Sequence, residues 1–157
     1  MKFEELSDSM DSKEVEIENT KIQESCFDYE KELVEYVVDN IDVFAKQILN
    51  DEIISFEVEK LVGKKRRYGK TKAIDLFING AKSIYIIEFK NPKFPTENRE
   101  AIGQILNYGR EFSDSKKELI IITTYFDLDT AKTISYYNLP IRYIYLSKKH
   151  IIEYRGD

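Results

Sequence analysis

Residues 74–109 read IDLFINGAKSIYIIEFKNPKFPTENREAIGQILNYG, and the pattern in this stretch is the main indicator of the fold. Its first half holds two apolar runs joined by an Asn79-Gly80 pair. Apolar runs that flank Asn-Gly predict two antiparallel strands in a β-hairpin. Two prolines then break the chain before a helical pattern over residues 97–112. We therefore expect strand, turn, strand and helix in that order.

Charged side chains mark the ends of the two predicted strands. Asp75 lies at the start of the first apolar run, and Glu88 and Lys90 close the second. If the hairpin loop covers residues 80–83, Asp75 lies opposite Glu88 in the strand pair. A tight two-residue turn would place Asp75 beside Ile84 instead. We favour the wider turn because it brings the two carboxylates together.

Two carboxylates at this place need a partner of opposite charge. An unpaired buried carboxylate is costly, and two that converge repel each other unless a cation lies between them. Residues i and i+2 of a strand share a face, so Glu88 and Lys90 point the same way while Phe89 points into the opposite layer. The simplest interpretation is a divalent metal site, and hard oxygen ligands favour Mg²⁺.

Two helices carry further candidates. Gln104 and Tyr108 are four residues apart and share a face of the predicted helix. Tyr108 alone would be interpreted as a core residue, but with Gln104 beside it both fit the lining of a site. Earlier in the chain, apolar residues from Leu33 to Ile48 follow a helical period, and Glu30 lies in the first turn. A glutamate there is ordinarily a surface residue that supports the helix dipole.

These elements in this order resemble the PD-(D/E)xK nuclease superfamily, and the helix motif is similar to its RecB-like branch: Asp75, then Glu88-x-Lys90, then Gln104-x-x-x-Tyr108. The segment Glu30–Leu33 resembles the Glu-x-x-Leu of the first helix of that fold. The resemblance covers about residues 25–146. It departs from the pattern at Ile74, where proline is common, and at Gly69, which lies too far from Asp75 for the usual Gly-x-x-Asp spacing.

The resemblance implies a restriction-endonuclease-like core and a metal-dependent nuclease that hydrolyses phosphodiester bonds in DNA. The implied metal ligands are Asp75, Glu88, Glu30 and the main-chain carbonyl of Phe89. Mg²⁺ is the expected metal and Mn²⁺ the alternative. Lys90 would orient water or stabilise the transition state, and Gln104 and Tyr108 would hold the nucleotide or the lysine. The alternative function is a catalytically inactive nucleic-acid-binding module or regulatory adaptor on the same fold.

Charge is distributed unevenly along the chain. The net charge is −5, and residues 1–24 hold eight acids against three lysines, which accounts for all of it. Residues 60–72 carry seven basic residues and no acid. Such a segment is ordinarily a solvated turn, but beside a metal site it would contact the phosphate backbone. The predicted nucleic-acid-binding residues are Lys64, Lys65, Arg66, Arg67, Lys70 and Lys72.

The chain as a whole fits one α/β domain, with a mixed sheet of about five strands flanked by helices. We expect residues 25–157 to form the nuclease-like domain and residues 1–24 to be an appended acidic segment. A single cysteine and the lack of a long apolar run in 157 residues lead us to expect a cytoplasmic protein without a membrane span. RNA is an alternative substrate, and a homodimer is compatible with the sequence.

Overall fold

The computed structural model describes residues 26–63 and 72–154. Its framework is one six-stranded sheet whose strands lie side by side in chain order. They are β1 (Ile53–Leu61), β2 (Ala73–Gly80), β3 (Ile84–Lys90), β4 (Lys117–Thr123), β5 (Ile141–Leu146) and β6 (Ile151–Tyr154). The pairs β3–β4 and β4–β5 are parallel, and the other neighbouring pairs are antiparallel. The predicted mixed sheet with flanking helices is confirmed. The prediction of about five strands omits the short strand β6.

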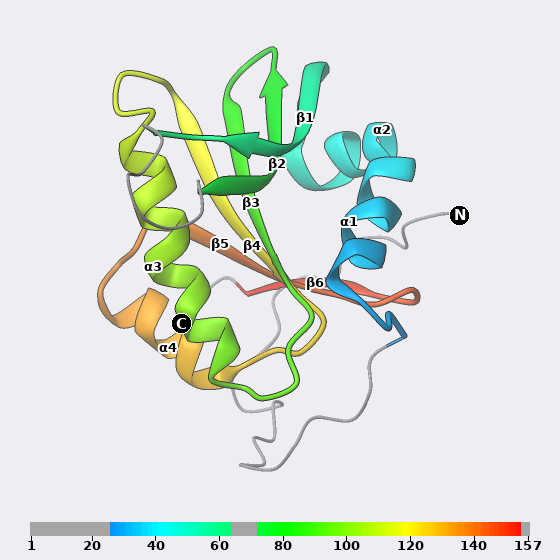
Figure 1. Cartoon of the computed structure of the whole chain (residues 1–157), viewed down its shortest axis with the longest axis vertical. Coiled ribbons are helices and arrows are strands. Elements are labelled where there is room, and N and C mark those ends of the chain that lie inside the picture. Colours follow the sequence, from blue (N-terminus) through cyan, green and yellow to red (C-terminus); the bar gives the residue numbers. More distant parts are fainter. Residues whose placement is uncertain (1–25, 64–71, 155–157) are drawn as a thin grey trace.

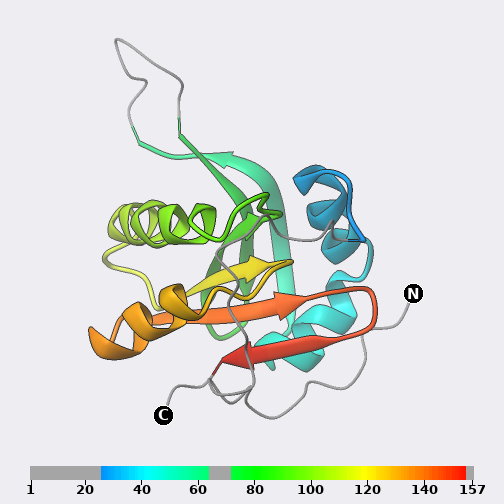
Figure 2. The same ribbon diagram turned by 90° about the horizontal axis from the view of Figure 1, so that it is seen from below.

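Helices cover both faces of this sheet (Figure 1). Seen from below, α1 and α2 lie on one side of the strands and α3 and α4 on the other (Figure 2). The helical elements are α1 (Glu30–Asp39), α2 (Ile41–Phe44), a π-helical turn η1 (Ala45–Leu49), α3 (Glu97–Arg110) and α4 (Leu128–Tyr136). In the part of the chain that the structure describes, no helix combines the length and the apolar character that crossing a membrane requires.

The first helical region is interrupted, whereas the sequence pattern predicts one continuous helix from Leu33 to Ile48. The interruption lies at Asn40, whose side-chain Nδ2 donates to the carbonyl of Tyr36 at 2.8 Å. Asparagine side chains compete with the backbone for helical hydrogen-bond partners, and they favour helix ends for that reason. The prediction of one helix is therefore wrong at this residue, although the apolar face continues through α2 and η1.

The sheet separates two hydrophobic cores. Residues of α1, such as Leu33 and Val37, pack against strand residues that include Ile87 and Phe89. On the opposite face, buried residues of α3 and α4 pack against strand residues such as Ile86. Strand β3 contributes to both cores because successive side chains point to opposite faces. It is therefore buried on both sides, as its uninterrupted apolar sequence predicts.

The register of the β2–β3 hairpin is the wider of the two alternatives. Asn79 pairs with Ile84, and the Gly80 N–H donates to the Ser83 carbonyl at 2.9 Å. Asp51, from the loop before β1, accepts hydrogen bonds from the Lys82 N–H at 3.0 Å and the Tyr85 hydroxyl at 2.7 Å. The preference for the loop of residues 80–83 is thus confirmed, and a contact from outside the hairpin holds this loop.

Candidate metal centre

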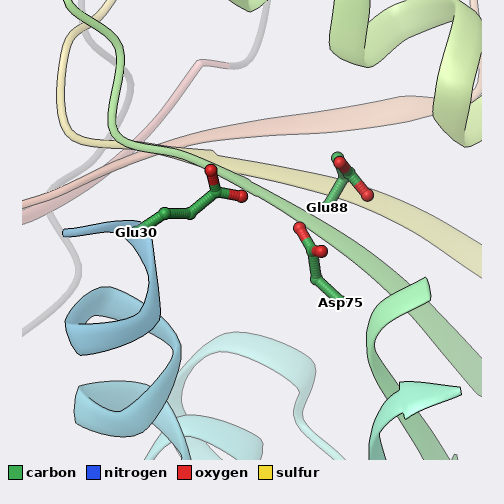
Figure 3. Close-up of side chains that lie close together, drawn as sticks. All are labelled: Glu30, Asp75 and Glu88. Atoms are coloured by element: carbon green, nitrogen blue, oxygen red, sulfur yellow. The ribbon is translucent and has the colours of Figure 1, made fainter. Parts of the chain in front are cut away.

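Three carboxylates converge at one edge of the sheet (Figure 3). Asp75 comes from β2, Glu88 from β3, and Glu30 is the first residue of α1. One carboxylate oxygen from each lies within 4.8 Å of the other two. The structure therefore brings together the three acidic side chains that the sequence indicates as metal ligands, including Glu30, for which a surface role was the ordinary alternative.

Asp75 holds its position through a main-chain contact with the neighbouring strand. The paired residues of β2 and β3 run from Asn79↔Ile84 to Leu76↔Ile87, and Asp75 and Glu88 lie next to this last pair. At this point the Phe89 N–H donates to the Asp75 Oδ2 at 2.8 Å. A carboxylate that accepts from the main chain of the next strand is held in place before any ligand arrives.

Glu88 lies deeper than the other two acids. It is only 4% exposed, and its Oε2 has no hydrogen-bond partner within residues 26–63 and 72–154. Lys90 is half-buried two residues further along β3, while the side chain of Phe89 between them belongs to the core beneath α1. The expected alternation of faces along Glu88, Phe89 and Lys90 is confirmed.

Glu30 depends on a contact between segments that are far apart in the sequence. The side chain of Asn91, directly after β3, donates from Nδ2 to the Phe27 carbonyl at 2.9 Å. Asn91 Oδ1 also accepts from the Thr124 hydroxyl at 2.7 Å. The chain just before α1 is therefore fastened to the ends of β3 and β4. Sequence reasoning treated Asn91 only as part of a chain break before a proline, so this positioning role was missed.

The electrostatics of the centre reflect an excess of acid. Burial, followed by the negative charge of Asp75, raises the pKa of Glu30 to about 7. Burial and then the Asp75 charge also raise the pKa of Glu88 well above its ordinary value. Burial likewise raises the pKa of Asp75, against the opposing effects of the Phe89 N–H and the Lys90 ammonium. Without a cation, the three groups therefore retain protons at a pH where ordinary carboxyls have lost them.

Two further acids contribute negative charge from outside this group. The charge of Glu97, in the first turn of α3, acts on Glu30, and the charge of Glu59 on β1 acts on Asp75. Glu59 has a left-handed backbone with φ of 53° in the middle of its strand. Neither residue is part of the motif that directed attention to this region. To predict their roles, one would have to know that β1 lies beside β2 and that the start of α3 lies near Glu30.

Helix α3 brings the predicted Gln104 and Tyr108 to the same side of the sheet as Glu88. Burial raises the pKa of Tyr108 to about 12, with smaller contributions from the charges of Glu88 and Asp75. The Oε1 atom of Gln104 is buried without a hydrogen-bond partner in the described part of the chain. Tyr108 is thus a buried residue of the core on this face on which the acidic charges act, and Gln104 carries an unsatisfied oxygen one helical turn before it.

These observations fit a divalent cation. The donor set consists of carboxylate oxygens, which Mg²⁺ and Mn²⁺ accept as ligands. Buried polar atoms normally have a partner, and a cation beside Glu88 would give its orphaned carboxylate oxygen one. The arrangement can hold a cation between Glu30, Asp75 and Glu88. Coordination by the carbonyl of Phe89 stays a prediction.

The predicted nucleic-acid-binding segment is described at one residue only. Lys72 is half-buried directly before β2, and its carbonyl accepts from the Val62 N–H at 3.1 Å. The other five predicted residues, Lys64, Lys65, Arg66, Arg67 and Lys70, lie outside the described residues. So do the acidic residues 1–24.

Comparisons with known proteins give limited information. No family model matches the sequence, and no curated protein matches it either. Among solved structures, the fold is similar to the small subunit of the heterodimeric restriction endonuclease R.BspD6I, with 13% sequence identity and a TM-score of 0.42. The similarity covers 74% of this chain and 68% of that one. At this level of similarity, the assignment of function depends on the carboxylate centre itself.

Proposed function

We propose that this protein is a metal-dependent deoxyribonuclease that hydrolyses phosphodiester bonds, with a restriction-endonuclease-like core formed by residues 25–157. The observation that carries the proposal is the convergence of Glu30, Asp75 and Glu88, with an unsatisfied buried oxygen on Glu88. An acidic group of this kind is unfavourable for folding unless a cation occupies it. A catalytic centre gives a functional reason for the chain to keep it.

Each residue has a distinct task in the proposed mechanism. Glu30, Asp75 and Glu88 would hold Mg²⁺, or Mn²⁺ in its place. The bound cation would supply Lewis acidity towards the phosphate and would lower the pKa of water. The main-chain N–H of Phe89 orients the Asp75 carboxylate through the 2.8 Å hydrogen bond. Fixed ligands reduce the reorganisation that the reaction requires.

Lys90 is the group that we assign to the reacting phosphate. Its charge acts on all three carboxylates, so its ammonium belongs to the same electrostatic environment. There it would orient the attacking water or stabilise the negative charge that develops on the phosphate oxygens. Gln104 and Tyr108 would hold the nucleotide or the lysine from the α3 side. The basic residues between β1 and β2 would supply sequence-independent phosphate contacts.

A cleavage assay with matched variants tests this proposal. Labelled linear, circular, single-stranded and junction DNA is incubated with the protein in Mg²⁺, in Mn²⁺ or in EDTA. We expect cleavage that requires metal, and we expect Asp75→Asn and Glu88→Gln to reduce it to background without loss of the fold. Glu35→Gln, at an exposed glutamate of α1, is the control and should cleave like the wild type.

The outcomes separate the two candidate functions. Near-normal cleavage by Asp75→Asn or Glu88→Gln would contradict the assignment of the site. DNA binding without cleavage in any metal, by a folded wild-type protein, would instead favour the inactive nucleic-acid-binding module. A fluorescence anisotropy titration of the same DNA in EDTA supplies the binding measurement, and circular dichroism checks the fold of each variant.

A further inference from the structure

A groove lies between the first turn of α3 and one side of α4. It is shallow and largely open to solvent, with a volume of about 410 Å³. Four of its residues recur on α4 at helical spacing and so form a single stripe on that helix. The lining residues are Arg99, Asp129, Lys132, Thr133, Tyr136 and Tyr137.

The groove presents two bare aromatic rings. Tyr136 is 82% exposed and Tyr137 is 67% exposed. Their ring centroids are 4.9 Å apart and the ring planes meet at 82°. A nucleobase offers a flat π-face to such rings, and base–aromatic stacking tolerates any base. Neighbouring bases cover these faces in a duplex, so a platform of this kind selects an unpaired strand.

Two cations accompany the rings. Arg99 is held by Asp129 at 2.9 Å and by the buried Asp127 at 3.4 Å, so its orientation is fixed. Lys132, one helical turn before Tyr136, is exposed and makes no ion pair within residues 26–63 and 72–154. A phosphate would therefore meet Lys132 without displacing an existing carboxylate partner. Because two carboxylates offset the charge of Arg99, Lys132 supplies the positive charge beside the rings. Aromatic rings next to a basic group suit the bases and the backbone of a single strand.

A buried hydrogen-bond network joins α3 to the start of α4 beside the groove. The Tyr143 hydroxyl donates to Asn98 Oδ1 at 3.1 Å and accepts from the Asp127 N–H at 3.0 Å. Asp127 in turn caps the start of α4 by accepting from the Thr130 N–H at 3.1 Å. The two helices are thus fixed relative to each other beside the groove. A preformed site avoids the cost of ordering loops when a ligand binds.

The groove lies on the face of the sheet to which Glu88 points. Glu88 and Ile86 share a face of β3, and Ile86 packs with the residues of α3 and α4. Arg99 and Gln104 are on one helix, five residues or about 7.5 Å apart along its axis. Helix α3 therefore connects the groove with the side of the sheet on which Glu88 lies.

We infer that this groove binds an unpaired segment of the nucleic-acid strand, with Tyr136 and Tyr137 stacking on bases and Lys132 contacting a phosphate. The inference rests on the proposed nuclease function, and it narrows the substrate to DNA with a single-stranded region. It also means that residues of α4, and not the residues that would perform the chemistry, select the substrate.

Binding in EDTA tests the groove apart from catalysis. Fluorescence anisotropy compares a labelled single-stranded oligonucleotide with a blunt duplex of the same sequence. We expect the double variant Tyr136→Ala/Tyr137→Ala to lose at least about tenfold in affinity for the single strand, the size that stacking of one or two bases supplies. The matched variant Tyr136→Phe/Tyr137→Phe keeps both rings and should bind like the wild type. Affinity for the duplex should stay the same in both variants.

A salt series adds a second measurement. Lys132→Ala should lower the slope of log affinity against log salt for the single strand by about 0.7, the value for one phosphate contact. Lys46→Ala, at an exposed lysine of η1, is the control and should leave the slope unchanged. Unchanged single-strand affinity in the alanine double variant, an equal loss for the duplex, or no single-strand binding by the wild type would each overturn the inference.

The experiments distinguish a wrong assignment of the groove from a wrong assignment of the nuclease activity. If the alanine double variant binds normally while the wild type cleaves with Mg²⁺, the binding role of the groove is contradicted and the catalytic role of the carboxylates is supported. If single-strand binding depends on the tyrosines but no DNA is cut, the groove stands and the proposed catalysis fails. Thermal melting of each variant confirms that it is folded, and these exposed tyrosines leave the core intact.

Discussion

Glu88 and Glu153 are both buried glutamates of the same sheet, and their surroundings are opposite. Glu153 on β6 accepts from the Arg142 guanidinium through both oxygens, at 2.6 Å and 3.1 Å. Glu88 on β3 has Asp75 and Glu30 as neighbours, and one of its oxygens has no hydrogen-bond partner in the described part of the chain. The charge of Glu153 is paired within the fold, whereas Glu88 keeps an oxygen to which a ligand could bind.

This contrast indicates a structural role for Glu153 and a functional role for Glu88. A bidentate arginine–carboxylate pair needs nothing further, and removing one member leaves a buried charge. A group of acids with raised pKa values lowers stability unless a cation or protons are present. Burial alone therefore does not distinguish Glu88 from Glu153, whereas the presence of a partner of opposite charge does.

Beyond the metal ligands themselves, the largest effect on cleavage should come from Lys90, the cation beside the acidic centre. We expect Lys90→Ala to reduce the turnover number by on the order of 10²-fold or more, since it removes an electrostatic stabiliser of the transition state. DNA affinity should change little, because the contact is strongest in the transition state. Single-turnover cleavage and anisotropy measure the two quantities, with Lys93→Ala as control. A loss of affinity alone would make Lys90 an ordinary phosphate contact.

Substitution of Glu153, the paired acid, should lower the stability of the fold. Glu153→Gln leaves Arg142 with Glu118 at 3.5 Å and the Ile48 carbonyl at 2.7 Å. Because the pair is mostly buried, its disruption should lower the free energy of unfolding by roughly 2 kcal/mol. Urea denaturation measures this change. A stability equal to that of the wild type would show that the completed pair adds nothing, and the contrast with Glu88 would lose its basis.

The register that places Asp75 near Glu88 can be tested at Gly80. A Cβ at this position would clash with the Asp51 carboxylate and lie 2.9 Å from a Tyr85 ring carbon. Gly80→Ala should therefore cost roughly 1–3 kcal/mol, the range for overpacking. Gly103→Ala, on α3, meets nothing within 4 Å and should stabilise the protein by about 0.5–1 kcal/mol. Equal effects at both glycines would contradict the close packing at the hairpin loop.

The same Glu→Gln change at the unpaired acid should have the opposite sign. Glu88→Gln removes the repulsion with Asp75 and Glu30, so the metal-free protein should gain about 1 kcal/mol at pH 8. Mg²⁺ should stabilise the wild type and have little effect on this variant, because the cation needs the carboxylate. Thermal melting in EDTA and in Mg²⁺ measures both. Destabilisation of the metal-free variant would show that Glu88, like Glu153, stabilises the fold.

The smallest effect concerns the pH dependence of Glu30. Its pKa of about 7 in the folded protein lies above the ordinary value of 4.5. The stabilisation from its bound proton is therefore fully present below pH 4.5 and is lost as the pH rises through about 7. In EDTA, the melting temperature of the wild type relative to Glu30→Gln should fall between pH 5 and pH 8. A constant difference over this interval would show that Glu30 titrates normally.

The local pattern of the chain predicted most of the sheet and the relation between Asp75 and Glu88. Strand alternation placed Glu88 and Lys90 on one face, and the choice between two hairpin registers placed Asp75. The first follows from the local geometry of a strand, whereas the wider register was favoured because it brings the two carboxylates together. The interruption at Asn40 and the short strand β6 were missed, because a single side-chain hydrogen bond and a four-residue run leave weak periodic signals.

Long-range contacts account for the rest of the centre. Glu30 reaches Asp75 and Glu88 because Asn91 fastens the chain at Phe27, a residue 64 positions earlier. The Asp51 contact with Lys82 that holds the hairpin loop spans 31 positions. The groove between α3 and α4 likewise joins residues from two helices. Periodicity and turn chemistry act over a few residues, so the sequence could indicate which side chains carry the chemistry. Their convergence depended on packing between segments that are distant along the chain.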